Sequence, residues 1–258
     1  MLPRLHLFEF MDLEFFPASM RRRMTDCLRD VEAFTGLFNW AVPLIVELLG
    51  ASGRRSIVDL GTGSGGPIVR LFPKLVAAGA LDDLVLTDLY PNLEAIVAQP
   101  GLRYDPRSVD ASAVPNDLHG LRVLCNSFHH MPPDLARAVL ADAHAKGEPL
   151  LVLEALNRDP FAMVASVAVA VMAWILMPFL QRFDVGSALL WWLVPVVPVL
   201  LVWEGVVSCL RCYTRGEFGR MVATLPGATY ESGIVQTVFI GARIRWFYLN
   251  GSANTRLT

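Results

Sequence analysis

Residues 58–66 combine side chains and a spacing that could hold a nucleoside cofactor. An apolar run ends in Asp59, and glycines follow at positions 61, 63, 65 and 66. Glycine permits backbone conformations that other residues avoid and lets the chain approach a ligand closely. A helix that begins after such a turn offers free N–H groups to that ligand. A carboxylate such as that of Asp59 is not expected beside a bound pyrophosphate, because both are anions. It suits a ligand with a cationic amino-acid end.

Polar side chains that could take part in chemistry also follow two later apolar runs. Asp88 is placed to accept hydrogen bonds from ribose hydroxyls. Asn126 ends another run, and His129 and His130 come shortly after it. Because histidine titrates near neutral pH, either imidazole could act as a base toward an acceptor. Each histidine could instead cap the following helix or bind the backbone.

These residues fall within a repeated pattern of apolar run, turn and helical segment, which predicts the elements that position them. The expected strands are 57–60, 84–88, 102–104, 123–126 and 150–154, and the expected helices between them are 68–78, 93–98 and 135–145. Further along, a helix is expected at 215–224 and two strands within 227–248. Such alternation is typical of a parallel sheet with helices on both faces. Ligands of open α/β sheets bind beyond the carboxyl ends of the strands.

The acid, glycine turn and second acid resemble motif I and its surroundings in the class I S-adenosylmethionine (SAM)-dependent methyltransferases. The resemblance covers 56–154 and, less closely, the C-terminal strands. It implies a Rossmann-like, doubly wound α/β sheet with SAM as cofactor. It places an acid near the adenine amine after the third strand and a cofactor-lining segment after the fourth. The implied cofactor-binding residues are Asp59, Gly61, Thr62, Gly63, Gly65, Asp88, Leu89, Asp110, Ala111 and Asn126.

A second, looser resemblance concerns the segments outside the expected sheet. Residues 5–12 with Phe16 and Pro17, and residues 203–213, look like an uncharacterised group of bacterial SAM-dependent methyltransferase-like proteins, which shares Phe-His-His after strand four. Members of the wider family often fold an N-terminal segment over the pocket as a lid. The acids of that segment here are more simply explained as solvated surface residues: Glu9, Asp12 and Glu14. The expected catalytic residues are His129, His130 and Glu154, and no metal site is expected.

The partners of several charged residues remain open at this point. Glu154 could orient a histidine, bind the acceptor or form a salt bridge with Arg158. Glu204 and Arg211, seven residues apart on an expected helix, could pair with each other or with the lid. The glycines also satisfy G-x-G-x-x-G, so an NAD-dependent oxidoreductase is an alternative, although the sequence has no Tyr-x-x-x-Lys pair.

Two long apolar segments follow the expected fifth strand. Residues 161–180 contain no charged side chain, and residues 188–210 contain only Glu204. About 20 apolar residues suffice to cross a bilayer, so the segments predict a helical hairpin that enters and leaves a membrane on one side. The bias of arginines toward its flanks favours a cytoplasmic globular part. A shallow hairpin that only dips into the membrane, or a pair of buried core helices, would also fit.

The bulk composition excludes some functions and leaves others open. The net charge is −2, which gives no basic footprint for nucleic acid, and the four cysteines have neither disulfide nor zinc spacing.

We expect a helical cap at 1–55, a SAM-binding core at 56–157, the hairpin at 158–212 and sheet-completing elements at 213–258. The expected function is a membrane-associated methyltransferase that methylates oxygen or carbon of a small, lipophilic acceptor, with membrane lipid as a partner. The alternative is a membrane-tethered SAM sensor or assembly subunit without turnover, and the oligomeric state is left open.

Overall fold

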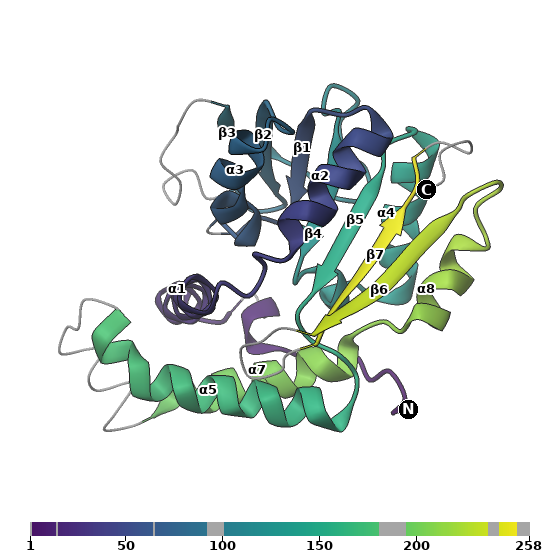
Figure 1. Cartoon of the computed structure of the whole chain (residues 1–258). Coiled ribbons are helices and arrows are strands. Elements are labelled where there is room, and N and C mark those ends of the chain that lie inside the picture. The colour runs from purple at the N-terminus through teal and green to yellow at the C-terminus, as the bar shows by residue number, and fades with distance from the viewer. Residues whose placement is uncertain are drawn as a thin grey trace.

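One mixed sheet forms the centre of the protein in the computed structural model, which describes residues 2–13, 15–63, 65–91, 101–180, 195–236 and 243–251 (Figure 1). Its seven strands lie in the order β3-β2-β1-β4-β5-β7-β6. The first five are parallel, whereas β7 runs antiparallel to both β5 and β6. The strand order reverses between β1 and β4, which is where ligand crevices of such sheets open.

The strands coincide with the apolar runs of the sequence because the inner strands are covered on both faces. Their bounds are Ser56–Leu60 (β1), Asp83–Asp88 (β2), Leu102–Ser108 (β3), Leu121–Cys125 (β4), Leu150–Glu154 (β5), Tyr230–Gln236 (β6) and Arg243–Leu249 (β7). All seven expected strands are therefore confirmed. Strand β3 continues four residues beyond the expected Tyr104 through a polar stretch that includes Pro106, as an edge strand allows. The expected helix 93–98 lies outside the described residues.

Helices cover both faces of the sheet (Figure 1). On one face, α2 (Ala41–Ser52) and α3 (Pro67–Ala77) pack into a hydrophobic core with the strands. On the other face, α4 (Pro133–Ala145) and α8 (Arg215–Val222) complete a second core. Both α3 and α4 begin with a proline at the first helical position, where the missing N–H costs nothing.

A third layer lies beyond the carboxyl ends of the parallel strands (Figure 1). It consists of α1 (Ala18–Thr35), α5 (Pro160–Leu180) and α7 (Val196–Arg211), which share a third hydrophobic core with residues of the N-terminal segment. Helices α5 and α7 pack along each other, and a Cβ on Gly205 of α7 would lie only 3.1 Å from Cβ of Ser166 on α5. This layer forms the wall opposite the strand ends.

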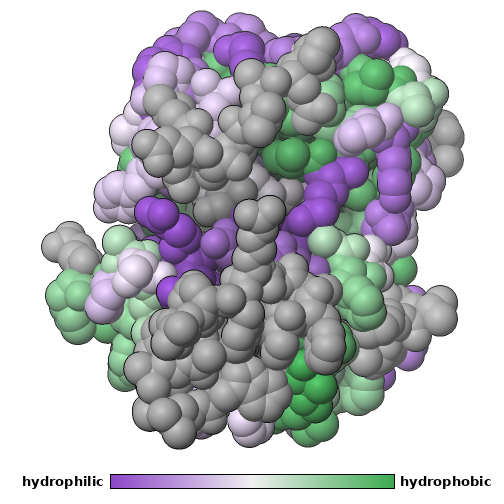
Figure 2. All heavy atoms as spheres, turned by 90° about the vertical axis from the view of Figure 1, so that its left-hand side faces the viewer, coloured by the Kyte–Doolittle hydropathy of each residue, from purple (hydrophilic) through white to green (hydrophobic). Residues whose placement is uncertain are grey.

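Helices α5 and α7 correspond to the two long apolar segments, and the connection between them at 181–194 lies outside the described residues. Among the described residues, no single helix has both the length and the apolarity to span a bilayer. Helices α7 and α8 together pass that test by length and composition, although they are bent by 53° relative to each other. In Figure 2, hydrophilic side chains are prominent over the upper part of the molecule, and hydrophobic side chains lie both at its upper right and beside the grey residues of the lower part.

Residues 2–13, here called the strap, run across α7. The backbone N–H of Leu5 donates to the carbonyl of Leu210, and Nε1 of Trp203 donates to the carbonyl of Phe8. The strap ends in a short 3₁₀ helix, η1 (Phe10–Asp12), whose first N–H donates to Oε1 of Glu204 at 2.7 Å. These bonds bring the strap to the carboxyl ends of β4 and β5.

Candidate active site

The glycine turn after β1 adopts the backbone that its sequence predicts. Gly61, Gly63 and Gly65 all have positive φ angles, of 74°, 56° and 91°, a region that disfavours side chains with a Cβ. The N–H groups of Gly61 and Thr62 both donate to the carbonyl of Thr87 at 3.0 Å, which fastens the turn to β2. No atom lies within 4 Å of where a Cβ on Gly63 would be, so the turn faces open space.

Asp88 at the end of β2 is tied to this turn. Its Oδ2 accepts from the N–H of Gly63 and its Oδ1 accepts from the N–H of Tyr90, both at 2.8 Å. A carboxylate can accept further hydrogen bonds beside these two. Asp110, by contrast, accepts from the N–H and hydroxyl of Ser112 in a local turn, and its expected role near adenine stays a prediction, as do those of Leu89 and Ala111.

Asp59 is buried at the end of β1, with 3 % of its surface exposed. Burial raises the pKa of its carboxyl to about 7, and the negative charge of Asp88 adds to the shift. A cation placed beside Asp59 would stabilise the ionised form and lower this pKa again. The position therefore suits a ligand that brings a positive charge to the end of β1.

Asn126 joins three elements at the end of β4. Its Oδ1 accepts from the N–H of Ala155 at 2.8 Å, and its Nδ2 donates to Oε1 of Glu32 on α1 at 3.0 Å. Asn126 has a φ of 50°, a left-handed conformation that asparagine tolerates better than most residues. Burial raises the pKa of Glu32 to about 7. Sequence reasoning missed Glu32, because its partner Asn126 lies 94 residues further along the chain.

His129 and Glu154 form a buried pair, with 2 % and 3 % of their surfaces exposed. Nδ1 of His129 lies 2.7 Å from Oε2 of Glu154, and the His129 backbone N–H donates to Oε1 at 3.0 Å. His129 belongs to η2 (Phe128–His130) after β4, and Glu154 ends the adjacent strand β5. When Nδ1–H donates a hydrogen bond to this carboxylate, Nε2 of the neutral ring carries the lone pair. The alternative salt bridge from Glu154 to Arg158 is wrong, because Arg158 binds Glu217 at 2.7 Å.

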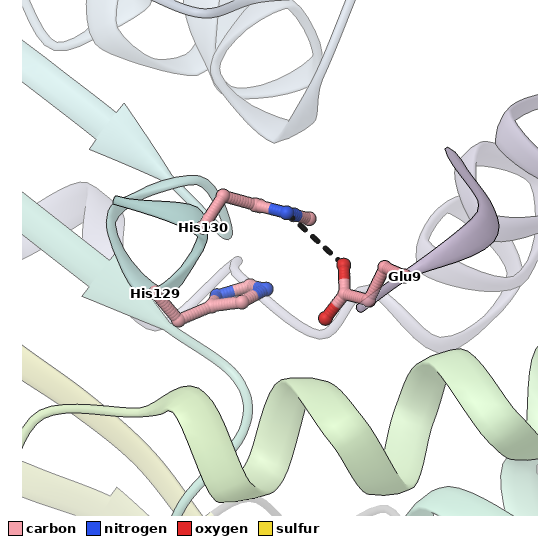
Figure 3. Close-up of side chains that lie close together, drawn as sticks. All are labelled: Glu9, His129 and His130. Atoms are coloured by element: carbon pink, nitrogen blue, oxygen red, sulfur yellow. Dashed lines mark ion pairs between the residues drawn. The ribbon is translucent and has the colours of Figure 1, made fainter. Parts of the chain in front are cut away.

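His130 faces the strap instead. Its Nδ1 lies 3.0 Å from Oε2 of Glu9 and 3.1 Å from Oδ1 of Asp12 (Figure 3). Burial alone would lower the pKa of His130, but its bonds to Asp12 and Glu9 raise it to about 10. His130 is therefore protonated at neutral pH in this arrangement and is a poorer base than the sequence suggested.

Glu9 is not the solvated surface residue that the sequence favoured, since none of its surface is exposed. Besides His130, it accepts from the hydroxyl of Ser208 at 2.8 Å, and its Oε2 lies 3.3 Å from NH1 of Arg211. Asp12 is half-exposed and binds the same NH1 at 2.6 Å; Glu14 is outside the described residues. Arg211 therefore pairs with the N-terminal segment expected as a lid, through Glu9 and Asp12, and not with Glu204.

An apolar pocket of about 230 Å³ opens from these residues into the third layer. Its inner end is formed by Asn126, His129 and His130, and Glu204 of α7 also lines it. Burial raises the pKa of Glu204 to about 7. The walls are mostly apolar side chains of α1, α5 and α7, including Leu28, Val31, Ala165, Val169, Ala173 and Leu201. The arrangement can hold a small apolar molecule against the His129 imidazole.

Comparison with known proteins gives no match to a family model and none to a curated protein sequence. Among solved structures, the chain is similar to the plantazolicin methyltransferase BpumL in complex with SAH, at 12 % identity and a TM-score of 0.57 over 93 % of each chain. It is also similar to human N-acetylserotonin methyltransferase in complex with SAM, at 12 % identity and a TM-score of 0.51. That match covers 96 % of this chain and 63 % of the human one. At such identities the likeness is one of fold.

Proposed function

We propose that this chain, which has the fold of class I SAM-dependent methyltransferases, binds SAM and transfers its methyl group to a small, apolar acceptor. The observation that carries the proposal is the position of the apolar pocket. Its inner end meets the His129–Glu154 pair, at the same edge of the sheet as the glycine turn and Asp88. Donor and acceptor would thus meet where strand order reverses.

Four features support SAM as the cofactor. The glycine turn leaves open space beside Gly63. Asp59 is a buried carboxyl with a raised pKa, which suits the ammonium group of the methionine part. Asp88 keeps unused acceptor capacity for ribose hydroxyls, and Asn126 lies at the end of β4, between the turn and the pocket. These residues would bind and orient SAM, which supplies an electrophilic methyl group on a sulfonium.

In the proposed reaction, a hydroxyl oxygen or an acidic carbon of the acceptor attacks the methyl carbon in line with the sulfonium. The new bond to carbon forms while the carbon–sulfur bond breaks, and its electron pair stays on sulfur. The attacking group of the acceptor must lose its proton. The lone pair on Nε2 of His129 is the base best placed to take that proton. Glu154 holds His129 by one hydrogen bond to ring Nδ1 and one from the backbone N–H, and it would stabilise the imidazolium that forms.

We also propose that the protein contacts a membrane through its third layer, with the sheet on the cytoplasmic side. Large apolar side chains of α5 and α7 are exposed there, including Val164, Val171, Ile175 and Val199. The pocket lies between the same helices. A lipophilic acceptor could therefore pass from the lipid into the pocket without crossing water. Membrane lipid would then be both a partner and the source of the acceptor.

The test is calorimetry with SAM and its demethylated product, followed by methyl release from labelled SAM with lipophilic hydroxyl compounds. We expect Asp88→Ala to weaken SAM binding by about 10- to 150-fold, because hydrogen bonds to a charged group contribute about 1.5–3 kcal/mol. Asp82→Ala is the matched control, since Asp82 is an exposed acid that pairs with Arg55 before the same strand. Absence of SAM binding would contradict the proposal, and binding without turnover over a broad panel would favour the sensor.

A further inference from the structure

We infer that Glu9, His129 and His130 form a binding site for one divalent transition-metal ion at the inner end of the pocket. Each of the three offers a ligand atom, and these atoms all lie within 4.8 Å of one another. Figure 3 shows the side chains pointing toward a common centre, Glu9 from the strap and both histidines from η2. Two imidazoles and one carboxylate are a donor set that holds such ions while leaving positions open for other ligands.

His129 is held as a metal-ligating histidine usually is. Its Nδ1 is bound to Oε2 of Glu154 at 2.7 Å, and its own backbone N–H donates to the other carboxylate oxygen. A carboxylate on one ring nitrogen fixes the tautomer and makes the other nitrogen a better ligand. The remaining nitrogen, Nε2, is the one that can face the ion. Glu154 is therefore a positioning residue for this site.

Glu9 and His130 already have the spacing of two ligands of one ion. Oε2 of Glu9 lies 3.0 Å from Nδ1 of His130. When each bond is about 2.1 Å long, adjacent ligand atoms are about 3.0 Å apart around an octahedral ion and about 3.4 Å apart around a tetrahedral one. Oδ1 of Asp12, at 3.1 Å from the same nitrogen, can serve as a further ligand. The hydroxyl of Ser208 binds Oε1 of Glu9 at 2.8 Å and holds that carboxylate in place.

The charges around the cluster also suit a dication. Glu9, Asp12 and Glu154 bring three carboxylates, against which Arg211 and the protonated ring of His130 supply two positive charges. NH1 of Arg211 is closer to Asp12, at 2.6 Å, than to Glu9, at 3.3 Å, so Glu9 remains available. A divalent ion that displaces the His130 proton to solvent would balance the two carboxylates that Arg211 leaves uncompensated.

The consequence for the reaction rests on the proposed function, whereas the metal site itself does not. An ion at this position would bind the acceptor through a hydroxyl oxygen and lower its affinity for its proton. The proton would leave to solvent, the oxygen–methyl bond would form, and the carbon–sulfur bond would break with its electrons on sulfur. The ion would then replace Nε2 of His129 in activating the acceptor. The substrate class would be apolar compounds with a phenolic or enolic hydroxyl.

The experiment titrates the chelator-treated full chain with cobalt(II) alone, by calorimetry and by visible absorption. We expect one ion per chain and absorption bands of nitrogen and oxygen ligation. Glu9→Gln should weaken cobalt binding by about tenfold or more, and Glu154→Gln by about 10- to 100-fold through the orientation of His129. Glu148→Gln is the matched control: Glu148 is equally buried and pairs with His119 at 2.8 Å, yet it precedes β5 at the opposite end of that strand.

If Glu9→Gln does not fold, His130→Gln, which alters a half-exposed side chain, gives the same test. Folded protein that binds no cobalt, or that binds it equally well after both substitutions, would overturn the metal site. SAM binding is measured on the same preparations. Cobalt binding without SAM binding would contradict the proposed function alone, and SAM binding without cobalt binding would contradict only the metal site.

Discussion

Under the proposed function, the buried carboxyl of Asp59 would couple SAM binding to pH. Its pKa of about 7 in the ligand-free protein lies above that of an aspartate in an unfolded chain. Between these two values the folded state binds more protons, so this group's contribution to stability is complete at low pH and is lost as pH rises through 7. An ammonium group beside Asp59 reverses the preference, because it favours the charged carboxylate.

We therefore predict opposite effects of Asp59→Asn on the two states. The substitution should raise the melting temperature of the ligand-free protein at pH 8, because no charge is then buried. It should also weaken SAM binding at that pH. In the wild type, SAM affinity should fall by up to about tenfold for each pH unit below 7, and in the variant it should not. Calorimetry from pH 6 to pH 8 checks this, and parallel pH profiles of the two proteins would count against it.

Some residues of the candidate site can be predicted from the sequence, and others cannot. Asp59, the glycines, Asp88, His129 and Glu154 all end or follow apolar runs, and parallel strands bring such positions to one edge. The pairing of His129 with Glu154 follows from that rule. Glu9 and Arg211 could not be found in the same way, because their positions depend on how the strap packs against α7. In the sequence, Glu9 has the same appearance as any surface acid.

Among the helices, the α5–α7 contact sets the width of the pocket. Gly205 lets the two helices approach closely, since any larger residue would press against Ser166. Both helices contribute to the pocket wall on either side of this contact. A forced separation would alter the walls without touching His129 or the glycine turn.

We predict that Gly205→Val lowers the free energy of unfolding by about 1–3 kcal/mol, the usual cost of overpacking. Gly50→Ala in α2 is the control, because nothing lies within 4 Å of the added Cβ; it should add about 0.5–1 kcal/mol from helix propensity. Urea denaturation of both variants provides the measurement. Equal stabilities would show that the helices are not in tight contact at Gly205.

For helices and strands, the sequence predicts the type of each element better than its position in the fold. Strands β1 to β5 and their helices follow from periodicity, because one face of each element must be buried. Helices α5 and α7 are apolar nearly all round, and such a pattern does not say whether protein or lipid covers them. The end of β3 was missed because its last residues are polar, as an edge strand permits.

Taken as a whole, the molecule has a sheet with helices on both faces and an apolar third layer at one end (Figure 1). The exposed apolar residues of α5 lie on that layer, with Val164 exposed over 70 % of its surface. Such a surface is unusual for a protein surrounded only by water. Contact with lipid would cover it and place the pocket beside the bilayer.

We predict that the purified protein sediments with phospholipid vesicles. Val164→Gln should weaken vesicle binding by about tenfold, because burial of a valine side chain contributes at least about 1.5 kcal/mol. Val76→Gln on α3, an exposed valine outside the third layer, should have no effect. Cosedimentation over a range of lipid concentrations checks this. Equal binding of the two variants would refute the proposed membrane face.

The strap has a consequence for how the protein is made. Glu9 finds its partners Ser208 and Arg211 about 200 residues further along the chain. During synthesis, the strap has no α7 to bind until residues 196–211 have emerged from the ribosome. Closing so long a loop is entropically costly and slow. The contacts of Glu9 with His130 and Arg211 should therefore form late, after the sheet, so that a chain truncated before α7 lacks this cluster even when its glycine turn has folded.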